Sequence, residues 1–266
     1  MKTYLSIIQT ERDPVNPRRE FENVGTLMAY HPKYDLGDND CTGDPPPTNF
    51  IDFLLGEIGV PGMEGFYIDD DGVLMDRHGN ELGLYEASVY KTQAEDWARN
   101  NVCMLPVYLY DHSGLSMSTS PYSCPWDSGQ VGFIYCTRHV ADNHGIAWER
   151  VPNMLKAEIA TMDAYLSGEV YGYILYDISD LAPEKIEELQ WLVDPVGYAY
   201  AKVYLLNGVQ HGEDINRLTR AAEEVDSCWG FYGYEYAQQV ALAAFEHMAQ
   251  VEKDRLDKIR SRYFCM

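Results

Sequence analysis

The sequence lacks any long run of apolar residues. A helix that crosses a membrane needs about 20 such residues in succession, and no run of this kind occurs among the 266 residues. The first positions, MKTYLSIIQTERD, become charged after only a few apolar residues, which does not fit a secretory signal peptide. We therefore expect a cytoplasmic protein with no membrane contact.

The sequence also lacks the short motifs that mark common catalytic and cofactor sites. It has no phosphate loop, no GxSxG nucleophile elbow and no HExxH zinc pair. Its six cysteines form no CxxC pair, so we expect reduced thiols and neither disulfides nor a zinc site. Two acidic runs, one with His31, Asp35, Asp38 and Asp40 and one at residues 69–71, lack the glycine and glutamate of a calcium loop. We predict no cofactor and no metal.

Basic residues are scarce. The chain holds 20 Lys and Arg against 42 Asp and Glu, a formal net charge of −22. Such a charge repels phosphate backbones, so we expect no direct binding of nucleic acid. Residues 35–127 alone hold 17 acids and 3 bases. Because duplex DNA carries one charge per about 1.7 Å, the net charge of −22 of the whole chain equals that of roughly 11 base pairs, which favours a DNA mimic that binds a basic surface. The alternative, in which the acidic residues serve only to keep the protein soluble, is weighted equally with the DNA mimic.

Apolar periodicity predicts an α+β fold with a mainly antiparallel sheet, packed amphipathic helices and a long C-terminal helix. Strands are expected at residues 2–11, 24–30, 102–110, 130–137, 171–178 and 198–206, and a hairpin within residues 66–86. Helices are expected from a cap at Thr48 to about residue 58, and at 88–100, 152–168, 186–193 and 234–262. Pro106 indicates a bulge or an edge position in its strand. We expect a single domain over residues 1–266.

The C-terminal helix carries a narrow stripe of small and apolar residues with a 4-3-4-3 spacing: Ala237, Ala241, Ala244, Met248 and Val251. Such a stripe fits docking onto the sheet, which we favour. It also fits the seam of a homodimer.

The segment from Tyr108 to Tyr135 concentrates polar and aromatic residues between two predicted strands, and functional residues often lie on loops held by a rigid scaffold. Its candidate binding residues are Asp111, His112, Trp126, Asp127, Ser128 and Gln130. One hypothesis is a structural turn in which Trp126 anchors the loop to the core. A second is a ligand-binding loop with a stacking Trp126. A third is a hydrolase with His112 as base, Asp111 or Asp127 as its orienting group, and Cys124 or a serine as nucleophile.

Two further segments supply candidate binding residues. The DSCWGFYG stretch before the last helix contains Trp229 and Tyr232, which fit core packing or an exposed aromatic recognition surface. Asp69, Asp70 and Asp71 lie at an acidic hairpin tip that could meet a basic partner.

Several short motifs are spread over most of the chain: residues 23–26, His31 with residues 34–38, and residues 109–114, 123–135 (SCPWDSGQVGFIY) and 226–233 (DSCWGFYG). They resemble the motifs of a family of proteins carried by phages, plasmids and integrative elements of Firmicutes-type bacteria, for which no reaction is established. The resemblance implies a phage or mobile-element setting, and with it the cytoplasm of a host cell. Relative to that family, about 40 residues at 181–221 form an apparent insertion.

Three functions remain open. The leading hypothesis is an acidic anti-defence protein that inhibits a host defence or DNA-handling protein by stoichiometric binding. The second is a small-ligand binder that sequesters a nucleotide signal, and the third is a hydrolase that uses Asp111, His112 and Asp127. The absence of a recognisable catalytic motif favours a protein that is not an enzyme.

Overall fold

The chain divides into two compact units, where the sequence predicted a single domain. The computed structural model describes residues 2–38, 49–181, 196–198, 201–207, 219–220 and 222–264. Unit 1 comprises residues 1–16 and 164–266, and unit 2 comprises residues 17–163. The larger sheet of each unit is built from that unit's own strands. The predicted α+β class with mainly antiparallel sheets and a long C-terminal helix is confirmed.

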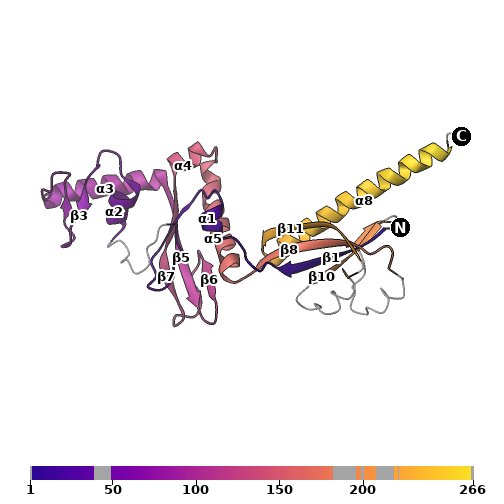
Figure 1. The fold of residues 1–266 in the computed structure, drawn as a ribbon. Coiled ribbons are helices and arrows are strands. Elements are labelled where there is room, and N and C mark those ends of the chain that lie inside the picture. The colour runs from indigo at the N-terminus through magenta and orange to yellow at the C-terminus, as the bar shows by residue number, and fades with distance from the viewer. Residues whose placement is uncertain are drawn as a thin grey trace. The chain divides into compact units, whose positions relative to one another are not determined.

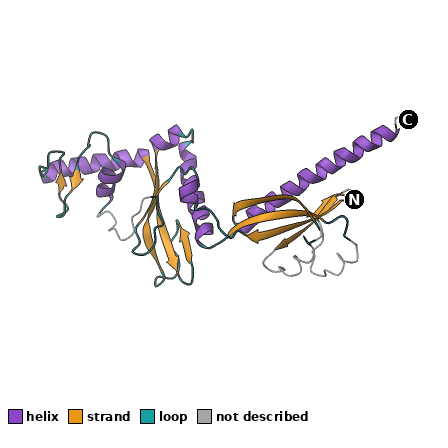
Figure 2. Ribbon diagram, in the orientation of Figure 1, coloured by secondary structure: helices purple, strands orange, loops and turns teal. Residues whose placement is uncertain are grey.

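In the part of unit 1 that the structure describes, a five-stranded sheet carries a long helix on one of its faces (Figures 1 and 2). The strand order is β11 (Glu223–Tyr232), β8 (Val170–Asp177), β1 (Lys2–Thr10), β10 (Ala201–Asn207) and β9 (Val196–Tyr198). The β1–β10 pair is parallel, and the other pairs are antiparallel. Side chains alternate along β1, so Tyr4 and Ile8 lie toward the helix while Leu5 and Ile7 are buried on the opposite face.

The helix of unit 1 is α8 (Tyr234–Phe264), and its first half docks on the sheet as favoured. Its fully buried stripe is Ala237, Ala241, Phe245 and Ala249, with Ala244 and Met248 packed beside it. The small alanines allow the helix to approach the sheet closely. The rings of Phe245 and Tyr4 pack edge to face, with their centroids 6.0 Å apart. Val251 departs from the predicted stripe, because its side chain is 51% exposed. The homodimer seam therefore stays a prediction.

The predicted insertion at 181–221 falls between two strands that pair directly, β8 and β11. Its described residues supply β9 and β10, and Ala201 and Val203 of β10 are fully buried. These two strands extend the sheet beyond β1. The helix expected at 186–193 lies outside the described residues.

Unit 2 contains a four-stranded antiparallel sheet covered on both faces. The strand order is β2 (Thr26–Ala29), β7 (Ser128–Thr137), β5 (Val102–Asp111) and β6 (Leu115–Ser118). Helix α5 (Val151–Leu166) begins with Pro152 in its first turn and buries Val151, Leu155, Ile159 and Met162. The apolar spacing of the sequence predicts a stripe of Leu155, Ile159, Met162 and Leu166, of which the first three are buried and Leu166 is half-buried. Gly25 lies between helix and sheet, since a Cβ there would come 2.5 Å from Leu155 and 2.8 Å from Ile134.

The opposite face of this sheet packs against α2 (Phe50–Phe53), the π-helical turn η1 (Leu54–Ile58), the hairpin β3–β4 (Tyr67–Ile68 and Leu74–Met75) and α3 (Leu84–Asn101). The cap predicted at Thr48 lies outside the described residues. The side chain of Asn49 accepts hydrogen bonds from the N–H groups of Ile51 and Asp52 and caps this helix. Phe53 meets the Phe133 ring edge-on at 4.4 Å. The remaining helices are α1 (Pro17–Glu20), α4 (Arg138–Asn143) and η2 (Trp148–Arg150).

Pro106 lies where its strand has a neighbour on one side. It pairs with Phe133 of β7, while β6 pairs with β5 only from Tyr108 onward. The register of β5 also shifts between Val107 and Tyr108. Both features fit a residue that cannot donate a backbone hydrogen bond, and they agree with the prediction of a bulge or an edge position.

Candidate binding groove

Six of the predicted site residues converge at one end of the unit 2 sheet. The ends of β5 and β7 place Asp111 and Asp127 side by side, with the Asp111 N–H donating to the Asp127 carbonyl at 2.9 Å. His112 Nδ1 lies 3.2 Å from Asp127 Oδ2. From the loop that follows β2, the Tyr34 hydroxyl donates to Asp111 Oδ2 at 3.2 Å. The negative charge of Asp111 raises the pKa of Tyr34, which keeps this hydroxyl a donor.

Trp126 does not anchor its loop to the core, and that hypothesis was wrong. Its side chain is 92% exposed. The loop is fixed instead by polar contacts, because the Ser128 hydroxyl donates to the Cys124 carbonyl at 2.5 Å and the Cys124 thiol lies 3.5 Å from Asp127 Oδ2. The indole therefore projects into solvent from a loop that is held at its base.

An open groove of about 450 Å³ lies beside this loop. It is lined by Tyr30, His31, Leu109, Asp111, Trp126, Asp127, Ser128, Gly129, Gln130 and Val131. His31 stacks on Tyr34 with ring centroids 4.7 Å apart, and Gln130 Nε2 donates to the Gly132 carbonyl at 3.2 Å. The lining residues include two carboxylates but no Lys or Arg.

The hydrolase arrangement is not assembled by the described residues. A nucleophile must contact its base, whereas His112 and Cys124 each contact the carboxylate of Asp127. The Ser128 hydroxyl donates its hydrogen bond to the Cys124 carbonyl. The carboxylate thus lies at the centre of the cluster, where it holds both neighbours.

The acidic hairpin tip lies elsewhere in unit 2 and has a local role. Asp69 Oδ1 accepts from the N–H groups of Asp71 and Val73 at 3.1 and 2.8 Å, which closes the turn between β3 and β4. Asp70 and Asp71 are exposed. Among the described residues no group of His, Cys, Asp or Glu side chains could hold a metal ion.

Trp229 and Tyr232 belong to unit 1 and are not part of the groove. The partly exposed Trp229 ring covers Gly172 so closely that a Cβ there would come 2.1 Å from it. Glu11 Oε2 accepts from the N–H of Gly230 at 2.9 Å, and the Tyr232 hydroxyl donates to the carbonyl of Val15 at 2.6 Å. The Trp229 ring therefore packs on β8 with one face, while 41% of the side chain stays exposed.

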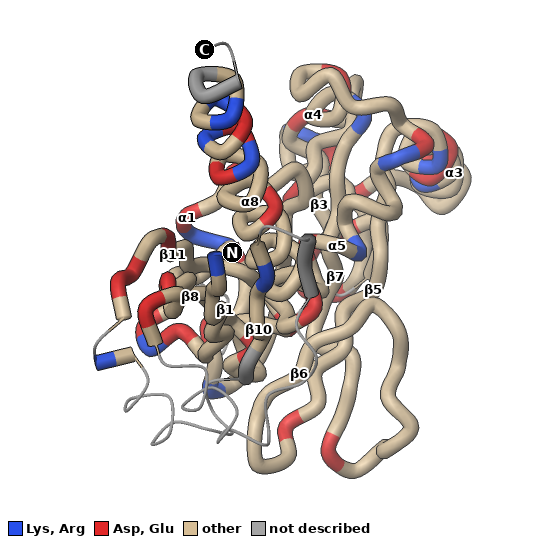
Figure 3. Tube along the Cα trace, turned by 90° about the vertical axis from the view of Figure 1, so that its right-hand side faces the viewer, with Lys and Arg blue, Asp and Glu red and all other residues tan. Residues whose placement is uncertain are grey.

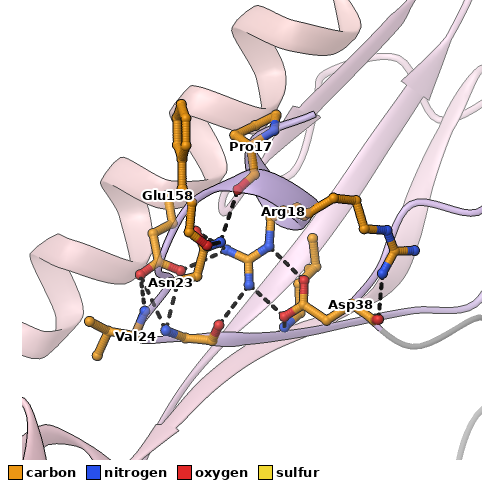
Figure 4. Close-up of polar contacts among 10 residues, drawn as sticks. Pro17, Arg18, Asn23, Val24, Asp38 and Glu158 are labelled. Atoms are coloured by element: carbon orange, nitrogen blue, oxygen red, sulfur yellow. Dashed lines mark hydrogen bonds and ion pairs between the residues drawn. The ribbon is translucent and has the colours of Figure 1, made fainter. Parts of the chain in front are cut away.

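Unit 2 also contains a buried arginine cluster that the sequence did not predict (Figure 4). The Arg18 side chain is 1% exposed and makes a two-point contact with Asp38, with Nε–Oδ1 at 2.7 Å and Nη2–Oδ2 at 2.5 Å. Its Nη1 donates to Glu158 Oε2 at 2.7 Å and to Asn23 Oδ1 at 2.9 Å, and Nη2 donates to the Gly25 carbonyl at 2.6 Å. Burial of the guanidinium lowers its pKa, but the hydrogen bonds with Asp38 and Glu158 outweigh this effect and raise it.

This cluster joins residues 23–25 to Asp38 and Glu158 through hydrogen bonds. Glu158 Oε1 also accepts from the Val24 N–H, and Asp38 Oδ2 accepts from the Leu27 N–H, each at 2.8 Å. The cluster thereby ties α1, the start of β2 and α5 to one another. Its groups are turned inward on each other, so its role is structural.

The acidic surplus is uneven across the elements. Residues 49–101 form α2, the hairpin and α3, which together cover one face of the unit 2 sheet. This cover holds 11 acids and 3 bases. Figure 3 shows basic and acidic segments interspersed along the outer part of α8. Many carboxylates are engaged within the protein, as at Arg18 and at Lys2, whose Nζ lies 2.5 Å from Asp177.

Among the described residues, no helix combines the length and apolar character that crossing a membrane requires. No family model, no curated protein and no solved structure matches this chain.

Proposed function

We propose that this protein acts by stoichiometric binding to a partner protein with a basic surface, and that an arginine side chain of the partner enters the groove beside Trp126. The observation that carries the proposal is the 92% exposed indole of Trp126, presented by a loop with fixed ends next to Asp111 and Asp127. Tryptophan is enriched among the residues that dominate protein interfaces. A large apolar side chain left in water supports a binding role.

The groove suits a guanidinium group. A planar guanidinium stacks on an aromatic face and donates paired hydrogen bonds to a carboxylate, whereas an ammonium group offers neither geometry. Asp111 and Asp127 supply the acceptors, and the lining residues supply no competing Lys or Arg. The same features disfavour a phosphorylated nucleotide, which would meet two carboxylates and no permanent cation.

The acids of residues 49–101 support the wider proposal. With 11 acids against 3 bases, this cover adds a negative field that accelerates encounter with a basic partner, although such fields affect association rate more than final affinity. We propose that the partner is a host defence or DNA-handling protein whose basic surface ordinarily contacts DNA, and that occupying this surface inhibits it. We assign specificity to the groove, and we assign attraction of the partner to the acidity.

The test compares a short arginine-containing peptide with the same peptide carrying citrulline, a neutral analogue of arginine, by titration calorimetry. The intact protein should bind the arginine peptide, and the citrulline peptide should bind at least about tenfold more weakly. Trp126→Ala should weaken binding by about tenfold, since a cation over a tryptophan face contributes roughly 1–2 kcal/mol. The Asp111→Asn/Asp127→Asn double variant should weaken it further.

The matched control is Asp70→Asn/Asp71→Asn, which removes the same charge from the exposed hairpin tip. The proposal predicts that this control weakens peptide binding only slightly. Added salt should weaken binding by the intact protein to a similar extent. Equal losses for both double variants, with full binding by Trp126→Ala, would mean that acidity acts without the groove. Preserved melting temperatures would show that each variant is folded.

A further inference from the structure

Unit 1 contains a second open pocket, of about 500 Å³, where β11 passes into α8. It is lined by Glu169, Tyr232, Gly233, Tyr234, Glu235, Tyr236 and Gln239. Gly233 has a φ of +101°, a value that L side chains rarely adopt, and this allows the sharp turn from strand to helix. The turn brings three tyrosines to one pocket over five consecutive residues.

Each of these tyrosines is held by a contact of its own. The Tyr234 ring meets Tyr171 edge-on at 5.4 Å, and the Tyr236 ring meets Phe231 edge-on at 5.7 Å. The Tyr232 hydroxyl donates to a backbone carbonyl. Because these contacts hold the rings in place, a ligand does not have to order them, and this lowers the entropic cost of binding.

The electrostatics of the pocket favour a cation. Glu169 and Glu235 are exposed, and among the described residues their carboxylates have no hydrogen-bond or ion-pair partner. The lining residues contain no Lys or Arg. Burial raises the pKa of Tyr232 and Tyr234, so both phenols stay neutral at physiological pH. Glu235 lies in the first turn of α8, where its negative charge offsets the positive end of the helix dipole.

We infer that this pocket binds a quaternary ammonium group, which the tyrosine faces of Tyr232, Tyr234 and Tyr236 attract and the carboxylates of Glu169 and Glu235 neutralise. Aromatic rings attract alkylated ammonium ions through the negative potential of their faces, and such ions need no hydrogen-bond acceptor. Both a trimethylated lysine side chain and a choline head group carry this chemistry. The site lies in unit 1 and does not depend on the groove of unit 2.

The test titrates the intact protein with choline and with its neutral isostere 3,3-dimethylbutanol, and follows the tyrosine signals by NMR. Choline should bind saturably, and the isostere, which has the same shape without the charge, should bind at least about tenfold more weakly. Tyr236→Leu should weaken choline binding by about fivefold or more. This variant should fold, because the Tyr236 side chain is 55% exposed.

Two further variants separate a specific pocket from general acidity. Glu169→Gln/Glu235→Gln should weaken choline binding, while the control Tyr85→Leu, which changes an exposed tyrosine of unit 2, should leave it unchanged. A trimethyllysine peptide titrated in parallel identifies the source of the ligand, since whichever probe binds more tightly indicates a protein or a small molecule. Equal binding of choline and its isostere, no saturable binding of either cation, or equal losses in Tyr236→Leu and Tyr85→Leu would overturn the inference.

Discussion

Replacing Arg18 by methionine should destabilise unit 2 severely. The side chain is 1% exposed and joins Asp38 to Glu158. Methionine fills a similar volume but leaves two largely buried carboxylates without their cation. Removing one partner of a buried ion pair costs about 3–5 kcal/mol, since the remaining charge is neither hydrated nor compensated.

The loss should be visible globally and locally. For a chain of this size, 1 kcal/mol shifts the melting temperature by roughly 2–4 °C, so a decrease of about 10 °C is expected. Hydrogen exchange should also accelerate at Val24 and Leu27, because their N–H groups donate to the two carboxylates that lose Arg18. Calorimetry measures the first effect, and mass spectrometry of exchanged peptides measures the second.

The neighbouring arginine provides the control. Arg19 pairs with Asp35 at 2.9 Å, but both side chains are more than 40% exposed, so Arg19→Met should cost at most about 1 kcal/mol. Adding Asp38→Asn and Glu158→Gln to Arg18→Met should recover part of the loss, since it removes the unpaired charges. If Arg18→Met melts within a degree or two of Arg19→Met, the cluster does not stabilise the fold as argued.

Three more predictions concern packing and titration. Gly132→Ala should destabilise unit 2 by about 2–3 kcal/mol in urea unfolding, because its Cβ would lie 1.9 Å from a carbonyl oxygen of β2, whereas Gly129→Ala in the same strand meets nothing within 4 Å and should be neutral. Phe245→Ala should cost about 3–5 kcal/mol and Val251→Ala almost nothing, which measures how far α8 docks. Burial raises the pKa of Cys136 to about 11, so its thiol should resist alkylation near neutral pH while the exposed cysteine of β11 reacts. Since the folded state holds that proton more tightly, the stability from Cys136 is complete below its unfolded pKa of about 8.5 and declines as pH rises toward 11.

Elements with strong apolar periodicity were predictable. The stripe of α5 and the alternation in β1 specify type and buried face together, because each period allows only one set of residues to face a core. The start of α3 was misplaced at Ser88. Leu84 and Tyr85 open this helix with exposed side chains, and no side chain caps it, so neither burial nor a cap marked its beginning.

The division into two units and the arginine cluster could not be read from the chain. Sheet partners separated by more than a hundred residues, such as β1 and β8, leave no local pattern. Arg18 and Arg19 are adjacent and chemically alike, yet only Arg18 meets Glu158, which lies 140 positions away. The exposure of Trp126 was equally hidden, because tryptophan is usually buried and the polar contacts that hold its loop fit a structural turn as well as a binding loop.

The Arg18 cluster also bears on the proposed groove. Inside unit 2 the protein binds a guanidinium between carboxylates, Asp38 and Glu158, that arrive from distant segments. At the groove it offers two further carboxylates, Asp111 and Asp127, fixed by backbone and ring contacts but with no arginine of its own among the lining residues. We propose that this second pair, beside the exposed indole of Trp126, receives a guanidinium group of a partner as Asp38 and Glu158 receive that of Arg18. The net charge of −22 is therefore a poor measure of binding capacity. The carboxylates that remain unengaged by the protein's own cations are the ones available to a partner.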